Sequence, residues 1–330
     1  MASKGQNAAT AEALIYTAPG LAKRRALTLD PLGPGDVEVE TLYSGLSRGT
    51  ERLVSQGLVP ASEHERMRAP FQRGAFPFPV AYGYAAVGRV TAGDPDRLGE
   101  TVFALHPHQT RFRVPGAAAV PVPPGVPAHR AVLAANSETA LNAIWDAQLV
   151  PGTRVAVIGA GLLGCLIAGL LSRRSDIDLI LCDVIGARRA LALELNVTFA
   201  EPTELPRDRV VTFHTSATAA GLATALGCLA FEGRVIELSW YGDRPVSLVL
   251  GGAFHANRLS IVSSQVGHVA GPRRATTSHR RRLELALEAL SDPRLDALVT
   301  EEIAFDALAP AIPRLLSAEA PGIATRVKYG

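Results

Sequence analysis

Hydrophobic residues follow two different patterns in the two parts of this chain. In the first 125 residues, short runs such as residues 37–40 and 86–90 alternate apolar and polar positions between Pro and Gly residues. Such alternation is typical of short, half-buried strands. From residue 151 onward, continuous apolar runs alternate with stretches of helical spacing. This second pattern predicts βαβ units and a parallel sheet behind a small, irregular β domain.

The predicted elements can be placed along the chain. We expect strands at residues 154–158, 179–182, 210–213, 234–238, 260–264 and 324–329. We expect helices from the glycines after residue 158 through Leu171, and over residues 187–195, 217–229 and 283–290. The first sixteen residues are predicted to form a loose tail, and residues 63–73 a surface loop or short helix.

Length and composition limit the class of protein. At roughly 100–200 residues per domain, the 330 residues suggest two domains. A net charge of +2 argues against a nucleic-acid partner. The longest apolar run, residues 160–171, is shorter than the roughly 20 residues of a membrane span, and the N-terminus lacks a signal-peptide pattern. We therefore expect a soluble, cytoplasmic protein without a membrane partner. Three cysteines without metal or disulfide spacing (Cys165, Cys182 and Cys228) are predicted to be buried thiols.

The most specific motif is GAGLLG at residues 159–164, between an apolar strand and a helix. Gly159 permits the tight turn, Gly161 lets the backbone approach a pyrophosphate, and Gly164 lets helix and strand pack closely. Backbone N–H groups at Leu162 and Leu163, in the first turn of the helix, face the phosphates. The motif predicts a dinucleotide site.

The choice between NAD and NADP depends on the end of the next predicted strand. Asp183 stands there, where a carboxylate can accept hydrogen bonds from the ribose hydroxyls and repel a 2′-phosphate. NAD(H) is therefore preferred. Arg188 and Arg189 follow closely and leave NADP(H) open.

Several short motifs resemble the medium-chain dehydrogenase/reductase superfamily, which contains the zinc alcohol dehydrogenases. They are GPGDV at 33–37, Gly83, TALN at 139–142, the glycine motif and RVKY at 326–329. The resemblance implies a GroES-like β domain over residues 1–135, completed by 296–330, and a doubly wound Rossmann domain over 136–295. It also implies an active site in the cleft between the domains. A homodimer joined through the last Rossmann strand, residues 260–264, is implied as well.

The sequence departs from this superfamily at its zinc ligands. The positions of the catalytic zinc ligands are occupied by Ser47, Tyr84 and Ala135, and no cysteine lobe stands between Val102 and Pro115. Hydroxyl and methyl groups do not replace thiolate or imidazole ligands, so we expect no zinc. The segment SGLSRGTE at 44–51 resembles the zinc-free branch that contains bacteriochlorophyllide dehydrogenase.

Without zinc, a protein group must hydrogen-bond the reacting oxygen and move its proton. The resemblance directs Tyr84 into the cleft, either as this acid or as a filler of the vacated metal volume. His106 stands at a substrate-pocket position and titrates near neutral pH. Ser47 and Glu51 are further catalytic candidates, although Glu51 could instead pair with Arg48.

The resemblance also implies residues around the nicotinamide and the substrate. Thr139 and Ser264 are expected near the nicotinamide. The substrate-pocket candidates are His108, Glu138, Trp240, Tyr241 and His268. The two aromatic residues either form a wall for a bulky substrate or pack between the domains.

The leading hypothesis is a metal-free, NAD(H)-dependent oxidoreductase acting on a small-molecule secondary alcohol or its ketone. Two alternatives stay open. One is an NADPH-dependent reductase of a conjugated double bond, which needs only polarisation of the enone oxygen. The other is a dinucleotide-binding protein without catalytic activity.

Overall fold

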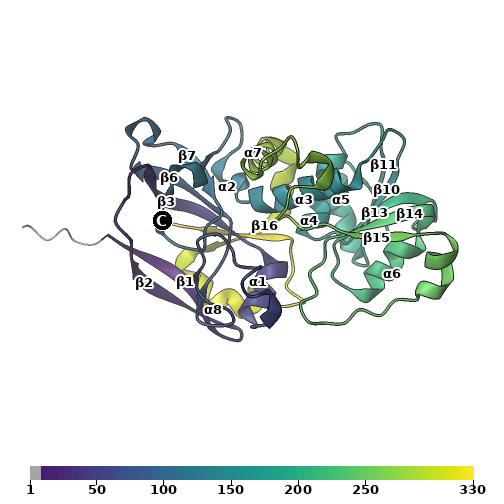
Figure 1. The fold of residues 1–330 in the computed structure, drawn as a ribbon, viewed down its shortest axis with the longest axis horizontal. Coiled ribbons are helices and arrows are strands. Elements are labelled where there is room, and N and C mark those ends of the chain that lie inside the picture. The colour runs from purple at the N-terminus through teal and green to yellow at the C-terminus, as the bar shows by residue number, and fades with distance from the viewer. Residues whose placement is uncertain (1–8) are drawn as a thin grey trace, which may run out of the picture. The chain divides into compact units, whose positions relative to one another are not determined.

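The computed structural model describes residues 9–330, and these divide into two compact units (Figure 1). Residues 9–133 and 300–330 form the first unit, and residues 134–299 form the second. The sequence placed the corresponding boundaries after residues 135 and 295. The α/β fold class, with a small antiparallel unit and a parallel Rossmann unit, is confirmed.

The first unit is built on two sheets. One sheet has the order β2-β1-β5-β4, and the other has the order β16-β17-β3-β6-β7-β9, with β8 also paired to β3. The strands are β1 (Thr10–Ala18), β2 (Leu21–Thr28), β3 (Asp36–Leu46), β4 (Arg73–Gly74), β5 (Val80–Ala81), β6 (Ala86–Ala92), β7 (Thr101–Ala104), β8 (Arg111–Pro115), β9 (Val120–Pro121), β16 (Val299–Ala304) and β17 (Ala324–Lys328). The helices are α1 (Arg48–Ser55), α2 (Ala128–Ala131) and α8 (Phe305–Leu315). Antiparallel pairing of β17 with β3 brings the end of the chain beside the residues that precede α1.

The prediction of a loose N-terminal tail is wrong from Thr10 onward, because β1 begins there and pairs with β2 over its length. Leu14 and Tyr16 are completely buried. Two of the four buried residues on β1, Ala11 and Ala13, are alanines, whose small side chains give a weak hydrophobic signal. The preceding part of the predicted tail, residues 1–8, lies outside the described residues.

The second unit is a parallel sheet with the order β12-β11-β10-β13-β14-β15, which is the doubly wound Rossmann order. Its strands are β10 (Arg154–Ile158), β11 (Asp178–Cys182), β12 (Thr198–Ala200), β13 (Arg209–His214), β14 (Leu229–Glu237) and β15 (Ser260–Ser263). Its helices are α3 (Ala134–Ala147), α4 (Leu162–Leu171), α5 (Arg189–Glu194), α6 (Ala219–Gly227) and α7 (His279–Ala289). The winding reverses between β10 and β13, where Ile158 lies opposite His214.

The interior of the second unit explains why its strands were easy to predict. Val155, Ala156 and Val157 on β10 are all fully buried, because neighbouring layers cover both faces of a parallel sheet. The three cysteines are buried and unbridged, as predicted. Burial raises the pKa of each thiol to about 12. Among the described residues, no helix has the length and apolar character that crossing a bilayer requires.

Candidate functional site

The glycine motif forms a tight turn between β10 and α4. Gly159 has a φ of +108°, and a Cβ atom on Gly164 would lie 1.9 Å from the Gly159 carbonyl oxygen. Gly161 opens on free space, with no atom within 4 Å of its Cβ position. Within residues 9–330, no side chain caps the N-terminus of α4, which begins at Leu162. The N–H groups of Leu162 and Leu163 therefore remain available to an anionic group, and the turn fits a dinucleotide pyrophosphate.

Asp183 holds its carboxylate beside this turn. Its Oδ2 accepts a hydrogen bond from the Ala160 N–H at 2.6 Å, and its Oδ1 accepts one from the Ile185 N–H at 2.8 Å. The side chain is half-buried at the end of β11, while Arg188 lies on the short helical turn that follows. The structure thus brings a fixed negative charge to the place where a ribose would be recognised.

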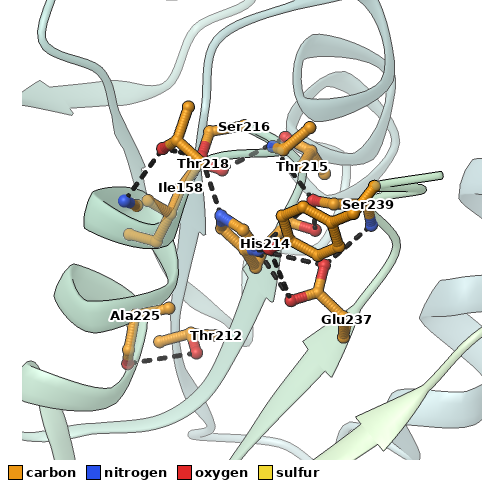
Figure 2. Close-up of polar contacts among 12 residues, drawn as sticks. Ile158, Thr212, His214, Thr215, Ser216, Thr218, Ala225, Glu237 and Ser239 are labelled. Carbon is orange, nitrogen blue, oxygen red and sulfur yellow. Dashed lines mark hydrogen bonds and ion pairs between the residues drawn. The ribbon is translucent and has the colours of Figure 1, made fainter. Parts of the chain in front are cut away.

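A polar cluster that the sequence reasoning missed lies at the carboxyl ends of β13 and β14 (Figure 2). His214 is fully buried, and its Nδ1 lies 2.8 Å from Glu237 Oε2. Its Nε2 lies 2.7 Å from the Ser216 Oγ. Because His214 and Glu237 end adjacent parallel strands, the predicted strand order could have shown that these two residues meet.

The two aromatic candidates follow β14. Trp240 and Tyr241 are half-buried, and the Tyr241 hydroxyl lies 3.4 Å from His214 Nδ1. Burial and the nearby Glu237 carboxylate raise the pKa of Tyr241 to about 12, so its hydroxyl stays protonated. Tyr241 therefore belongs to the His214 cluster.

The remaining candidates of the second unit have partners within it. A salt bridge of 3.0 Å joins Glu138 to Arg282, and both side chains are buried. Ser264 donates to Asp146 Oδ2 at 2.7 Å, and Thr139 donates to a carbonyl of its own helix. Burial raises the pKa of Glu138, and Arg282 opposes this shift. Glu138, predicted for the substrate pocket, and Ser264, predicted near the nicotinamide, are therefore buried and bonded within this unit. His268, by contrast, is exposed.

In the first unit, Glu51 is completely buried and is the centre of a polar network. Its Oε2 accepts hydrogen bonds from the Tyr16 hydroxyl at 2.8 Å and from His108 Nε2 at 3.0 Å. Its Oε1 accepts one from the backbone N–H of Ser47 at 2.7 Å. This last bond ties the N-cap residue of α1 to the fourth residue of the helix. Arg48, the alternative partner predicted for Glu51, donates to the carbonyl groups of residues 321 and 322.

The network continues from His108 to the end of the chain. Ser44 Oγ lies 2.7 Å from His108 Nδ1 and 2.9 Å from the Tyr329 hydroxyl. A Cβ atom on Gly83, which has a φ of +110°, would lie 2.8 Å from the His108 ring. The close approach of His108 therefore requires glycine at position 83, directly before Tyr84. His108, predicted for the substrate pocket, lies inside this network.

Tyr84 and Ser47 form the other end of the network, where Ser47 is buried and Tyr84 half-buried. The Tyr84 hydroxyl donates to Ser47 Oγ at 2.5 Å. Burial raises the pKa of Tyr84, and the Glu51 charge raises it further, while the bond to Ser47 opposes this shift. The structure therefore brings three of the four predicted catalytic residues together: Tyr84, Ser47 and Glu51.

His106 has different surroundings. Its ring stacks on Phe112, with centroids 4.0 Å apart, and lies 5.7 Å from the ring of Phe71. It lines a cavity with Asp30 and Arg73. Burial lowers the pKa of His106 to about 3, so the ring is neutral at ordinary pH. The structure separates His106 from the hydrogen bonds that join Tyr84 to His108.

The residues at the superfamily's zinc-ligand positions do not fit zinc. They are two hydroxyl side chains, Ser47 and Tyr84, bonded to each other, and the methyl group of Ala135. Within residues 9–330, no group of three or more His, Cys, Asp or Glu side chains is arranged to hold a metal ion.

No protein-family model matches the sequence. The 2-desacetyl-2-hydroxyethyl bacteriochlorophyllide A dehydrogenase of Cereibacter sphaeroides is 29% identical over 179 residues, which cover 48% of this chain and 52% of that protein. The match thus spans about half the length of that relative. Two Escherichia coli structures share the fold. L-Idonate 5-dehydrogenase has a TM-score of 0.78 at 14% identity and covers 97% of this chain and 98% of its own. An alcohol dehydrogenase complexed with NADH has a TM-score of 0.75 at 16% identity, with coverage of 97% and 99%.

The chain is thus similar in sequence to that dehydrogenase and in fold to solved alcohol dehydrogenases. Both findings support the resemblance to the medium-chain dehydrogenase/reductase superfamily that the short motifs predicted. The assignment of the chain to a zinc-free branch of this superfamily stays a prediction.

Proposed function

We propose that this chain is a medium-chain dehydrogenase/reductase that interconverts a secondary alcohol and its ketone with NAD(H) and without a metal ion. The observation that carries the proposal is the Tyr84–Ser47 hydroxyl pair, anchored by buried Glu51 at positions that hold zinc ligands in the zinc enzymes of the superfamily. A bound nicotinamide would supply or accept the hydride. The residues of the chain would bind that cofactor, orient the substrate and transfer the proton.

The cofactor would bind at the glycine turn. N–H groups at the start of α4 would hold the pyrophosphate, and the Asp183 carboxylate would accept hydrogen bonds from the adenosine ribose. A 2′-phosphate would be repelled by this carboxylate. This arrangement supports NAD(H) over NADP(H).

The proton would come from the hydroxyl pair. Ser47 accepts the Tyr84 hydrogen bond, and within the described residues its own hydroxyl hydrogen has no acceptor. That hydrogen can turn to a substrate oxygen. During ketone reduction, Ser47 would give its proton to the new alkoxide oxygen and take the proton of Tyr84, which solvent would then replace. Because the pKa of Tyr84 is raised, this donor stays protonated at ordinary pH.

Glu51 would act as a positioning residue. Its Oε1 holds the Ser47 backbone, while its Oε2 is held by Tyr16 and His108. The position of the Ser47 hydroxyl is therefore fixed by groups that do not themselves reach the substrate. Such fixed geometry is what donors to a reacting oxygen require.

The relative from Cereibacter sphaeroides supports an alcohol substrate. Its name places dehydrogenation at a molecule bearing a hydroxyethyl group, and a hydroxyethyl group is an alcohol. This favours the interconversion of an alcohol and its ketone over the reduction of a conjugated double bond.

The direct test is to follow NADH absorbance with a panel of ketones, enones and, in reverse with NAD, secondary alcohols. Fluorescence titrations with NADH and NADPH test the cofactor. We expect turnover with ketones and alcohols and tighter binding of NADH. Turnover restricted to enones, or tighter binding of NADPH, would overturn the corresponding part of the proposal. If NADH bound without turnover of any substrate, the chain would be a binding protein.

A further inference from the structure

Donor and acceptor chemistry gives a single direction to the hydrogen bonds of His214 that Figure 2 draws as dashed lines. The Glu237 carboxylate can only accept, so His214 Nδ1 carries a hydrogen toward it at 2.8 Å. In the neutral ring, Nε2 then accepts from the Ser216 hydroxyl at 2.7 Å. The only proton of the Ser216 hydroxyl is thus committed to His214.

The same direction continues beyond Ser216. Its Oγ lies 3.1 Å from Thr218 Oγ1, which accepts from the Gly221 N–H at 3.0 Å. Thr218 is therefore free to donate to Ser216. A Cβ atom on Gly221 would lie 2.0 Å from the Ser216 Oγ and 2.9 Å from His214 Nε2. Glycine at the start of α6 makes room for this contact.

Few charges face the buried imidazole. Glu237 on β14 accepts its Nδ1 hydrogen, and Tyr241 lies beside it with a pKa raised to about 12. The sequence of α6 contains no ionisable side chain, and the residue opposite His214 on β10 is Ile158. The imidazole therefore gains a charge only by taking a proton at Nε2, next to the Glu237 carboxylate.

Ser216 lies at the reversal point of the Rossmann sheet. Its backbone N is 2.9 Å from the Cβ position of Gly159, the first glycine of the turn. Thr215 donates to the Gly159 carbonyl oxygen at 2.9 Å. Ligands of doubly wound sheets bind at this point, outside the carboxyl ends of the strands. Ser216 thus lies against the turn that would hold the dinucleotide.

We propose that Ser216 donates a hydrogen bond to a pyrophosphate or ribose oxygen of the bound dinucleotide, and that His214 takes up a proton as this bond forms. The inference rests on the proposed function, since it requires a dinucleotide at the glycine turn. Turning the Ser216 hydrogen to the ligand would leave His214 Nε2 as a buried acceptor without a donor, which is unfavourable. A proton on Nε2 restores the Ser216 bond in the opposite direction.

Linkage fixes the sign of the effect. If dinucleotide binding promotes proton uptake, a lower pH must raise the affinity for the dinucleotide by the same coupling. If one full proton is taken up, the affinity for the dinucleotide should rise about tenfold each time the pH is lowered by one unit.

The test is isothermal titration calorimetry of NADH binding in phosphate and in Tris, at pH values between about 6 and 8. The dependence of the observed heat on the buffer's ionisation enthalpy counts the protons taken up. We expect uptake approaching one proton in the wild type and none in His214→Gln or Ser216→Ala. The Ser216→Ala change removes only one oxygen atom and keeps the test valid if His214→Gln fails to fold. Thr212→Val, which removes a hydroxyl bonded to α6 from the same strand, should keep the uptake.

The outcomes separate the two proposals. NADH binding with a buffer-independent heat in the wild type would overturn the coupling and leave the proposed function standing. Equal proton uptake in Ser216→Ala would also overturn it. Absence of NADH binding at every pH would overturn the proposed function itself. A parallel titration with ADP locates the acceptor: uptake with ADP places it on the pyrophosphate or adenosine ribose, and uptake with NADH alone places it on the nicotinamide ribose.

Discussion

Replacing Glu51 by alanine removes the shared acceptor of three buried donors. The Tyr16 hydroxyl, His108 Nε2 and the Ser47 N–H lie 2.8, 3.0 and 2.7 Å from its carboxylate oxygens. A buried polar group left without a partner costs about 1–3 kcal/mol. Taking the lower bound for each donor, the free energy of unfolding should fall by about 3 kcal/mol or more. That loss is a large part of the roughly 5–15 kcal/mol that holds a typical protein folded.

Glu51→Gln keeps one acceptor oxygen and adds an amide N–H group. His108 can accept from this amide if its hydrogen moves to Nδ1, where Ser44 Oγ can accept it. The expected loss for this variant is therefore smaller, about 1–2 kcal/mol.

Urea unfolding followed by far-ultraviolet circular dichroism measures both changes. With a denaturant slope of about 1–3 kcal/mol per molar urea, the alanine variant should unfold about 1 M or more below the wild type. Glu65→Ala, at an exposed position, is the matched control and should change stability by less than about 0.5 kcal/mol. If the midpoint of Glu51→Ala coincided with that of the control, the carboxylate would not hold these three donors, and the reasoning would be wrong.

Four further predictions concern the proposed reaction, cofactor binding and assembly. Tyr84→Phe should lower ketone turnover by about 10²–10⁴-fold and leave the affinity for NADH unchanged. The control Tyr43→Phe should change neither quantity. Steady-state kinetics measures the turnover, and fluorescence titration measures the affinity. Because the pKa of Tyr84 is raised, wild-type reduction should lose its proton donor only above pH values of about 10; an earlier loss that Tyr84→Phe abolishes would contradict this. Gly164→Ala should abolish NADH binding, because its Cβ would lie 1.9 Å from a carbonyl oxygen, while Gly227→Ala meets no atom within 4 Å and should bind normally. We also propose a homodimer through the exposed edge strand β15; sedimentation should then show a dimer that Val262→Lys converts to a monomer, and a monomeric wild type would refute it.

The sequence predicted features formed by residues that are close together along the chain, and it did not predict contacts between distant residues. The glycine turn and Asp183 were predictable because both are local features at the ends of apolar strands. The network around Glu51 was not, because its partners enter from β1, from the segment after β7 and from the chain terminus. Pairing of β17 with β3, which brings Tyr329 to Ser44, is a long-range contact that one sequence does not reveal.

Two neighbouring histidines illustrate the same limit. His106 and His108 are separated by a single proline, yet one stacks on Phe112 and the other bonds Glu51. Nothing in their local sequence distinguishes these surroundings. Similarly, Glu138 was a candidate for the substrate pocket because it stands beside Thr139. Its buried partner Arg282 is 144 residues away, and the local sequence does not reveal this pairing. For these polar residues, the sequence indicates possible reactivity but does not show which distant residues they contact in the folded chain.

The central claim is that hydroxyl groups of this chain take the place of a metal ion in hydride transfer with NAD(H). The most direct measurement is ketone turnover with NADH after dialysis against a chelator, with elemental analysis of the same sample. The account predicts that protein containing less than stoichiometric zinc keeps its full rate and that added zinc does not increase it. A rate that disappears with the chelator and returns with one equivalent of zinc would contradict the account.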